Sequence, residues 1–220
     1  MLRTETLTFL KKLDKNNDRE WFNVHKDQFI AAKENIAALT GNLIGQISKF
    51  DPEISGTLAE DCVFRIYRDV RFSKNKNPYK NNLGAYIAPG GRKSNLPGYY
   101  FHIQPGHCFI AAGLHMPESA DLLKVRKAID AQPKEFLKIV NAKGFKDRFG
   151  EPHGEKLKLM PKGFPADHPL IEFLKMKSMT ASREYKNDNI VLGQDYPKVL
   201  AADAKAIFPF ITFLRQALKG

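Results

Sequence analysis

Cysteine is scarce in this chain, and long apolar runs are missing from it. The 220 residues include only two cysteines, Cys62 and Cys108. Two thiols are too few for the disulfide framework of a secreted domain, so we expect a reducing compartment. No run approaches the ~18 apolar residues that a membrane-spanning helix needs. Charges at Arg3 and Glu5 precede any apolar run, which argues against a signal peptide. These absences predict a cytoplasmic protein that has no membrane partner.

The motifs of familiar catalytic, phosphate-binding and metal sites are also missing. The chain contains no GxSxG nucleophile motif and no GxxxxGK[ST] phosphate-binding loop. His102, His107 and His115 lie close to Cys108 in sequence, but their spacing matches no established zinc pattern. Residues 70–117 contain no carboxylate that could complete a ligand set. We therefore predict no metal site, and the sequence specifies no cofactor.

Acidic residues are scarce in one part of the chain. The formal net charge is +11, and residues 61–100 alone hold eight Lys or Arg against two Asp. Most of these cations lie in RIYRDVRFSKNKNPYKNN, residues 65–82, where Asp69 is the only acid. A local excess of positive charge raises the local concentration of anionic partners. The sequence therefore favours a partner that carries phosphate or carboxylate groups.

The apolar periodicity changes from helical to strand-like and back again. Helical spacing covers residues 5–13 and then runs from the N-cap residue Asp18 to about residue 50. Alternation predicts strands at 62–71, 83–88, 99–104 and 108–115, joined by short turns as an antiparallel meander. Helical patterns return from 117, with further strands suggested at 157–159 and 178–185. Helices are expected at 117–131, 133–142, 167–177 and 196–219, and Pro209 should break or kink the last one.

This order of elements predicts an α+β fold in a single domain, residues 1–220. An antiparallel sheet of about four to six strands, with its core in 62–115, is flanked by helices in 5–50 and in 117–220.

One face of the predicted sheet combines arginine with aromatic and amide side chains. Strand alternation places these residues on it: Arg65, Tyr67, Asp69, Arg71, Tyr86, Tyr100, His102 and Gln104. A solvated face usually carries Lys, Glu, Thr and Ser instead. Tyrosine offers a rigid ring with a polar tip, and arginine pairs in a bidentate manner with phosphate or carboxylate. We therefore predict a ligand site here, although a face covered by a helix would also account for the pattern.

The predicted ligand-binding residues continue into the next loop. Arg68 falls on the apolar side of the predicted strand, where a guanidinium needs a partner, and Glu60 or Asp61 could provide it. The loop FSKNKNPYKNN can cradle an anion with its lysines and backbone N–H groups. The full predicted binding set is Arg65, Arg68, Arg71, Lys74, Lys76, Tyr79 and Lys80.

Three functions are compatible with this site. In the first, the protein binds or converts a small phosphate- or carboxylate-bearing molecule that Arg65 and Arg71 hold. The catalytic candidates are Tyr67, Tyr100 and His102 for proton transfer, and Asp69 as a general base or as an ion-pair partner. In the second, the cations and aromatic rings bind nucleic acid, although no RNP, KH or helix-turn-helix pattern is present. In the third, the chain is a protein-interaction module without catalytic activity.

Four segments, in order, carry a family resemblance: LDKNNDREWF, FRIYRDVRFSKNKNPYKNN, GYYFHIQPG and HPLIEFLKMKS. With these segments the chain resembles the family catalogued as domain of unknown function 2461 over nearly its whole length. The family more often reads RFSKDKTPYKT in the central motif, where this chain has Asn75, Asn77 and Asn81. The resemblance implies one domain and assigns no activity, cofactor or catalytic residue.

Overall fold

Helices and one antiparallel sheet make up the fold, so the predicted α+β class is confirmed. The computed structural model describes residues 1–220, apart from the side chain of Asp188. The chain forms two compact units. The first contains residues 1–94, 100–110 and 184–202, and the second contains 95–99, 111–183 and 203–220. The single domain over 1–220 stays a prediction.

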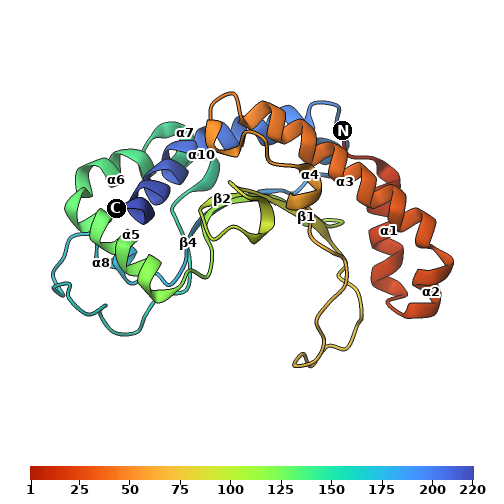
Figure 1. The fold of residues 1–220 in the computed structure, drawn as a ribbon, viewed down its shortest axis with the longest axis horizontal. Coiled ribbons are helices and arrows are strands. Elements are labelled where there is room, and N and C mark those ends of the chain that lie inside the picture. The colour runs from red at the N-terminus through yellow and green to blue at the C-terminus, as the bar shows by residue number, and fades with distance from the viewer. The chain divides into compact units, whose positions relative to one another are not determined.

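The first unit begins with three helices, α1 (Thr4–Lys15), α2 (Arg19–Val24) and α3 (Lys26–Ile47) (Figure 1). The Asp18 carboxylate accepts the Trp21 N–H at 2.8 Å, which confirms the predicted N-cap. The long helix expected from Asp18 is divided at His25, whose ring stacks on Trp21 and hydrogen bonds to the Trp21 carbonyl. The apolar faces of α1 and α3 pack together, and residues such as Leu10 and Ile36 are fully buried.

The sheet contains β1 (Leu83–Ile87), β2 (Gly98–Ile103), β3 (Cys108–Leu114) and β4 (Met179–Tyr185), hydrogen bonded in that order. Three strands of the predicted meander are confirmed, and so is the strand suggested at 178–185. The outer strands each carry one isolated bridge to a neighbouring segment. Val63 bridges Ala85 of β1, and His153 bridges Thr180 of β4.

The strand predicted at 62–71 is wrong. Helix α4 (Ala59–Cys62) includes its first residue, and the rest is irregular apart from bridges at Val63 and Tyr67. The chain touches β1 only briefly, through the Phe64 N–H and the Gly84 carbonyl at 3.0 Å. It then leaves β1 and pairs with its own returning segment, where Tyr67 bridges Tyr79. Residues 66–80 therefore form a loop, here called the basic loop, which extends away from β1 (Figure 1).

The later elements match the predicted helices in part. Helices α5 (Ser119–Ala131) and α6 (Pro133–Val140) are confirmed. The helix expected at 167–177 is only α8 (Ile171–Leu174), which has Leu170 at its N-cap. Residues 157–159 form no strand, and this region pairs only through a bridge between Lys156 and Met176. The sequence did not reveal α7 (Lys143–Phe149) or α9 (Asp188–Leu192), nor the short 3₁₀ turns η1 (Pro52–Ile54) and η2 (Gly91–Lys93).

The last helix, α10 (Tyr196–Lys219), contains Pro209 in its interior and continues past it, so the predicted break does not occur. Its residue Asp203 is fully buried and accepts hydrogen bonds from Arg148 and Arg183 within the second unit. No helix in the described chain combines the length and the apolar character that crossing a membrane requires.

Candidate functional site

The basic loop is anchored at its base by backbone and side-chain hydrogen bonds. The Arg68 N–H donates to the Pro78 carbonyl at 2.9 Å, and the Lys80 N–H donates to the Ile66 carbonyl at 2.8 Å. Asn17, which follows α1, holds Tyr79 in place from outside the loop. Its side-chain NH₂ donates to the Tyr79 carbonyl, and its side-chain oxygen accepts the Tyr79 N–H, both at 3.1 Å. The Tyr79 ring stacks on Phe22 of α2 with a centroid separation of 4.0 Å. These contacts fix the base of the loop against the N-terminal helices.

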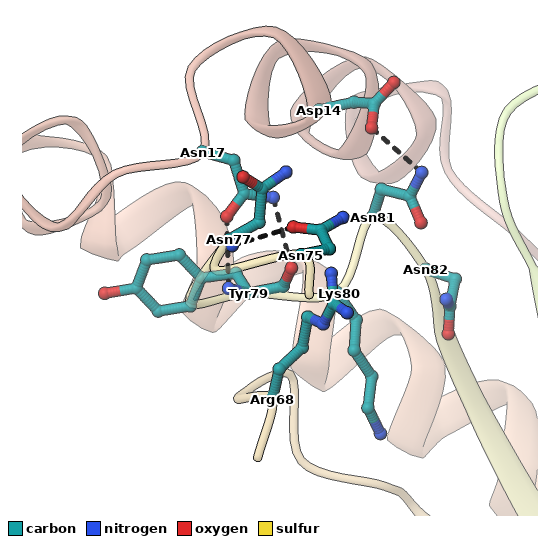
Figure 2. Close-up of a pocket in the computed structure, with 9 residues that line it drawn as sticks. All are labelled: Asp14, Asn17, Arg68, Asn75, Asn77, Tyr79, Lys80, Asn81 and Asn82. Carbon is teal, nitrogen blue, oxygen red and sulfur yellow. Dashed lines mark hydrogen bonds between the residues drawn. The ribbon is translucent and has the colours of Figure 1, made fainter. Parts of the chain in front are cut away.

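A cavity of about 190 Å³, here called the asparagine pocket, lies at this base (Figure 2). Its lining residues come from the end of α1 and from both sides of the loop: Asp14, Asn17, Arg68, Asn75, Asn77, Tyr79, Lys80, Asn81 and Asn82. The Asn81 amide donates to the Asp14 carboxylate at 2.9 Å, and the Asn77 backbone N–H donates to the Asn75 side-chain oxygen Oδ1 at 2.8 Å. The pocket is thus polar and partly preorganised.

Arg68 is the cation that faces this pocket. Figure 2 shows its guanidinium directed toward the asparagine side chains, whereas the Lys80 amine points away from them. Arg68 is half-buried and donates to the Ser73 hydroxyl at 3.3 Å. Among the described residues it forms no ion pair, so neither Glu60 nor Asp61 is the partner that the sequence suggested. Its remaining N–H groups can bind oxygen atoms of a ligand.

The asparagine amides add further donors to the pocket. The oxygen of Asn75 is already occupied by the Asn77 backbone, which leaves the Asn75 NH₂ group as a donor. The side-chain amides of Asn77 and Asn82 make no hydrogen bond with any residue that the structure describes. Uncharged donors of this kind complement a guanidinium around an anionic group, since they add hydrogen bonds without adding charge. The pocket can therefore surround an anionic group with donors from several directions.

Four other predicted cations, in the basic loop or next to it, do not line the pocket. Arg65, Arg71, Lys74 and Lys76 are all exposed. Arg71, whose side chain is 76% exposed, forms an ion pair with Asp69 at 2.7 Å, and this hydrogen-bonded guanidinium lowers the pKa of the Asp69 carboxyl. Lys76 donates to the Val70 carbonyl at 3.1 Å. Of the two roles considered for Asp69, the structure therefore contains the ion pair.

A second polar cluster lies on the sheet, where Tyr100, His102 and Gln104 form a chain of hydrogen bonds. The Tyr100 hydroxyl lies 2.8 Å from His102 Nδ1, and His102 Nε2 lies 3.0 Å from Gln104 Oε1. Because Oε1 can only accept, Nε2 carries the proton and Nδ1 accepts the hydrogen bond from Tyr100. Burial lowers the pKa of His102 and raises that of Tyr100 to about 12, so both side chains are uncharged at neutral pH.

Aromatic side chains surround this cluster. Phe109 stacks on His102 with a centroid separation of 4.6 Å, and Phe64 lies 6.0 Å from the Tyr100 ring. The Lys80 amine sits 5.5 Å from the centre of the Phe64 ring, and burial together with the charge of Arg65 lowers the pKa of Lys80. Three of the predicted face residues, Tyr100, His102 and Gln104, are thus together.

Tyr67 does not join them. It contacts Phe22 and Tyr79 instead, because residues 62–71 leave the sheet.

Most residues that line the asparagine pocket were not predicted as binding residues from the sequence. Asp14 and Asn17 follow the first helix, and nothing local indicates that they meet residues more than sixty positions away. One signal was present in the loop, where residues 75–82 contain four asparagines, at positions 75, 77, 81 and 82. No group of three or more His, Cys, Asp or Glu side chains within the described chain could hold a metal ion.

Comparison with known proteins gives a family and no characterised relative. A search of the curated proteins finds no match, and a search of the solved structures finds none. The family described as "Conserved hypothetical protein (DUF2461)" matches residues 5–213, which include α1, the basic loop, the whole sheet and most of α10. A match over so much of the chain shows that this protein belongs to the DUF2461 family.

Proposed function

We propose that this protein binds a small molecule bearing a phosphate or carboxylate group, and that the asparagine pocket holds the anionic group. The observation that carries the proposal is the half-buried Arg68 guanidinium, which faces the asparagine amides and forms no ion pair with a described carboxylate. The carboxylate in the pocket lining, Asp14, accepts a hydrogen bond from Asn81 and forms no ion pair with Arg68. A half-buried cation without an ion pair gains from a counter-charge. An anion entering the pocket supplies that charge and stabilises the site.

The chemistry of the lining supports an oxygen-rich anionic group. A planar guanidinium fork matches two oxygens of a phosphate or carboxylate, and the amides of Asn75, Asn77 and Asn82 offer additional N–H donors. The proposal places the anion at Arg68 rather than between Arg65 and Arg71, because Arg71 already pairs with Asp69. Neither Tyr100 nor His102 lines the asparagine pocket, so their role in proton transfer stays a prediction that binding at Arg68 does not require.

A thermal-shift series tests the proposal with inorganic phosphate, acetate, citrate and nucleoside monophosphates as probes. A ligand at 100 times its Kd adds about 2.7 kcal/mol to the free energy of unfolding. For a chain of this length, such a gain raises Tm by about 5–10 °C. We expect at least one probe to give a shift of this kind with the wild type and none with Arg68→Gln, which removes the cation from the pocket.

Arg71→Gln is the matched control, since it removes the same charge from the same loop outside the pocket. It should keep the wild-type shift, and Arg68→Lys should keep part of it because the charge remains while the fork is lost. An equal loss of the shift in Arg68→Gln and Arg71→Gln would contradict a specific pocket. The proposal also fails if no probe stabilises the wild type.

A second candidate function, nucleic-acid binding, is favoured by one observation in the basic loop. Phe72 is 95% exposed, and the Arg71 guanidinium lies 5.9 Å from the centre of its ring. An exposed ring among cations is suited to stacking on an unpaired base while Lys74 and Lys76 contact phosphates. This candidate uses the tip of the loop, whereas the small-molecule proposal uses its base.

A further inference from the structure

A larger groove lies beside the asparagine pocket within the first unit. Its volume is about 570 Å³, and it runs along α1 toward the turn that follows β2. We call it the α1 groove. Its lining combines apolar side chains, among them Leu7, Pro105 and Leu192, with polar ones that include Lys11, Lys15 and Gln104. Small-molecule sites typically occupy ~300–1,000 Å³. The volume of the α1 groove falls in this range, whereas the asparagine pocket, at about 190 Å³, is smaller.

The two cavities meet at one pair of side chains. Asp14 and Asn81 line both of them, and the Asn81 amide donates to the Asp14 carboxylate at 2.9 Å. Asp14 is exposed and Asn81 is half-buried, and their side-chain contact lies where the two cavities meet. A molecule whose anionic group reaches Arg68 can therefore extend past Asn81 into the groove.

From this arrangement we infer the class of ligand, an inference that rests on the proposed function. The ligand is an organic phosphate or carboxylate whose partly apolar body occupies the α1 groove while its anionic group binds at Arg68. Burial of the body against Leu7, Pro105 and Leu192 supplies affinity that a free inorganic anion lacks. The lysine at position 11 adds a cation near the body, which suits a second polar or anionic group there.

The buried hydrogen-bond chain on the sheet positions one residue of this groove. Gln104 lines the groove, and its Oε1 is held by His102, whose own orientation depends on Tyr100. The Gln104 NH₂ group forms no hydrogen bond with the described residues and so remains available to a ligand. Gln104 is thus a fixed donor at the end of the groove, and His102 and Tyr100 are positioning residues for it.

Two matched pairs of probes test the inference: inorganic phosphate with phenyl phosphate, and acetate with phenylacetate. Each pair shares an anionic group and differs by an apolar body, and the concentration dependence of Tm gives each Kd. With the wild type we expect the member with the body to bind about tenfold more tightly or better, in at least one pair. The pair that shows the gain identifies which anionic group the pocket prefers.

Two tryptophan variants test whether the apolar body of the ligand lies in the α1 groove. Thr8→Trp fills the groove from the exposed side of α1, whereas Lys12→Trp adds the same bulk on α1 outside the groove. We expect Thr8→Trp to remove the gain from the phenyl group and to leave the affinity for the inorganic or small anion unchanged. Lys12→Trp should keep the gain, and Arg68→Gln should weaken both members of the pair.

The outcomes separate this inference from the proposed function. If the small anions bind at Arg68 but the phenyl group adds nothing, the inference is wrong and the function stands. It is also wrong if the gain survives Thr8→Trp, because the body then lies elsewhere. If none of the four probes binds, or if Arg68→Gln leaves their binding intact, the proposed function fails and the inference fails with it.

Discussion

At the scale of single residues, surroundings distinguish cations that look alike in the sequence. Arg68 and Arg71 lie three positions apart, yet Arg68 faces a cavity and Arg71 is exposed and paired with Asp69. The asparagine pocket is lined by asparagines of the segment FSKNKNPYKNN, among them Asn75, Asn77 and Asn81. The position of Arg68 on the inner side of its segment was predictable from alternation. Its role at a cavity was not, because the cavity needs Asp14 and Asn17 from another part of the chain.

Burial makes Cys62 a poor nucleophile. Desolvation, aided by the nearby negative charge of Asp61, raises the pKa of its thiol to about 11, and Cys108 is also buried. At pH 8 the native protein should therefore react very slowly with a thiol reagent such as DTNB. In guanidinium chloride the same reagent should count both cysteines. Rapid modification of one thiol per native chain would contradict this expectation.

Buried His102 should make stability depend on pH in a defined direction. Its pKa lies below the ordinary 6.5 chiefly because of burial, which outweighs the raising effect of the hydrogen bond to Gln104, and the charges of His107 and Lys80 lower it further. As the pH falls through 6.5, the unfolded chain takes up a proton more readily than the native chain does, so the free energy of unfolding decreases. His102→Gln removes this proton uptake.

Urea unfolding at pH 7, 6 and 5 measures the effect. We expect wild type to lose more stability between pH 7 and pH 5 than His102→Gln loses, whatever their absolute difference at pH 7. Parallel pH profiles for the two proteins would show that His102 does not titrate differently on folding.

At the scale of elements, the alternation of apolar and polar residues correctly predicted the strands that hydrogen bond continuously to a neighbouring strand. The segments that became β1, β2, β3 and β4 all carried this signal. Residues 62–71 carry the same alternation, but they touch β1 only around Val63 and then bend into the basic loop. A period of two reports which side chains are buried, and burial of Cys62 and Ile66 does not need a strand. The long N-terminal helix was likewise divided by a local contact, the stacking of His25 on Trp21.

Two glycines in different elements should respond oppositely to alanine. In β1, a Cβ at Gly84 would lie 2.5 Å from the Phe101 carbonyl oxygen and 3.1 Å from the Tyr100 hydroxyl, so the neighbouring strand and the hydrogen-bond chain must shift. We expect Gly84→Ala to cost about 1–3 kcal/mol of unfolding free energy. In α3, a Cβ at Gly45 meets nothing within 4 Å, and Gly45→Ala should stabilise by about 0.5–1 kcal/mol.

Equilibrium unfolding in urea compares these variants with the wild type. Gly84→Ala should also displace Tyr100, whose burial raises its pKa to about 12. We therefore expect the tyrosine absorbance of this variant between pH 10 and 12 to differ from that of the wild type. If Gly84→Ala left the free energy of unfolding unchanged, β1 and β2 would be able to move apart at this point without loss of stability.

At the scale of the whole molecule, the net charge of +11 attracts anions of every kind, so affinity alone does not separate the two candidate functions. The salt dependence of binding separates them. For a single-stranded nucleic acid, log K falls with log salt by about 0.7 for each phosphate contacted. One anionic group held at Arg68 should instead give a slope of about one or less between 50 and 300 mM NaCl.

The measurement pairs the best small probe with a short single-stranded oligonucleotide, by thermal shift and by fluorescence anisotropy. We expect the small probe to show the shallow slope and to depend on Arg68. A steep slope for the oligonucleotide, together with loss of its binding in Phe72→Ala, would favour the second candidate and the tip of the loop as its site.

The bridges on the two outer strands bear on how copies of this chain behave when they meet. An open sheet ends in strands whose unpaired backbone groups can recruit a strand from another copy, which is the first step of aggregation. Val63 occupies part of that free backbone on β1, and His153 occupies part of it on β4. Each edge is thus left with only a short stretch to which a foreign strand could add. A protein with many exposed cations and two partly blocked edges is well protected against intermolecular β-sheet growth.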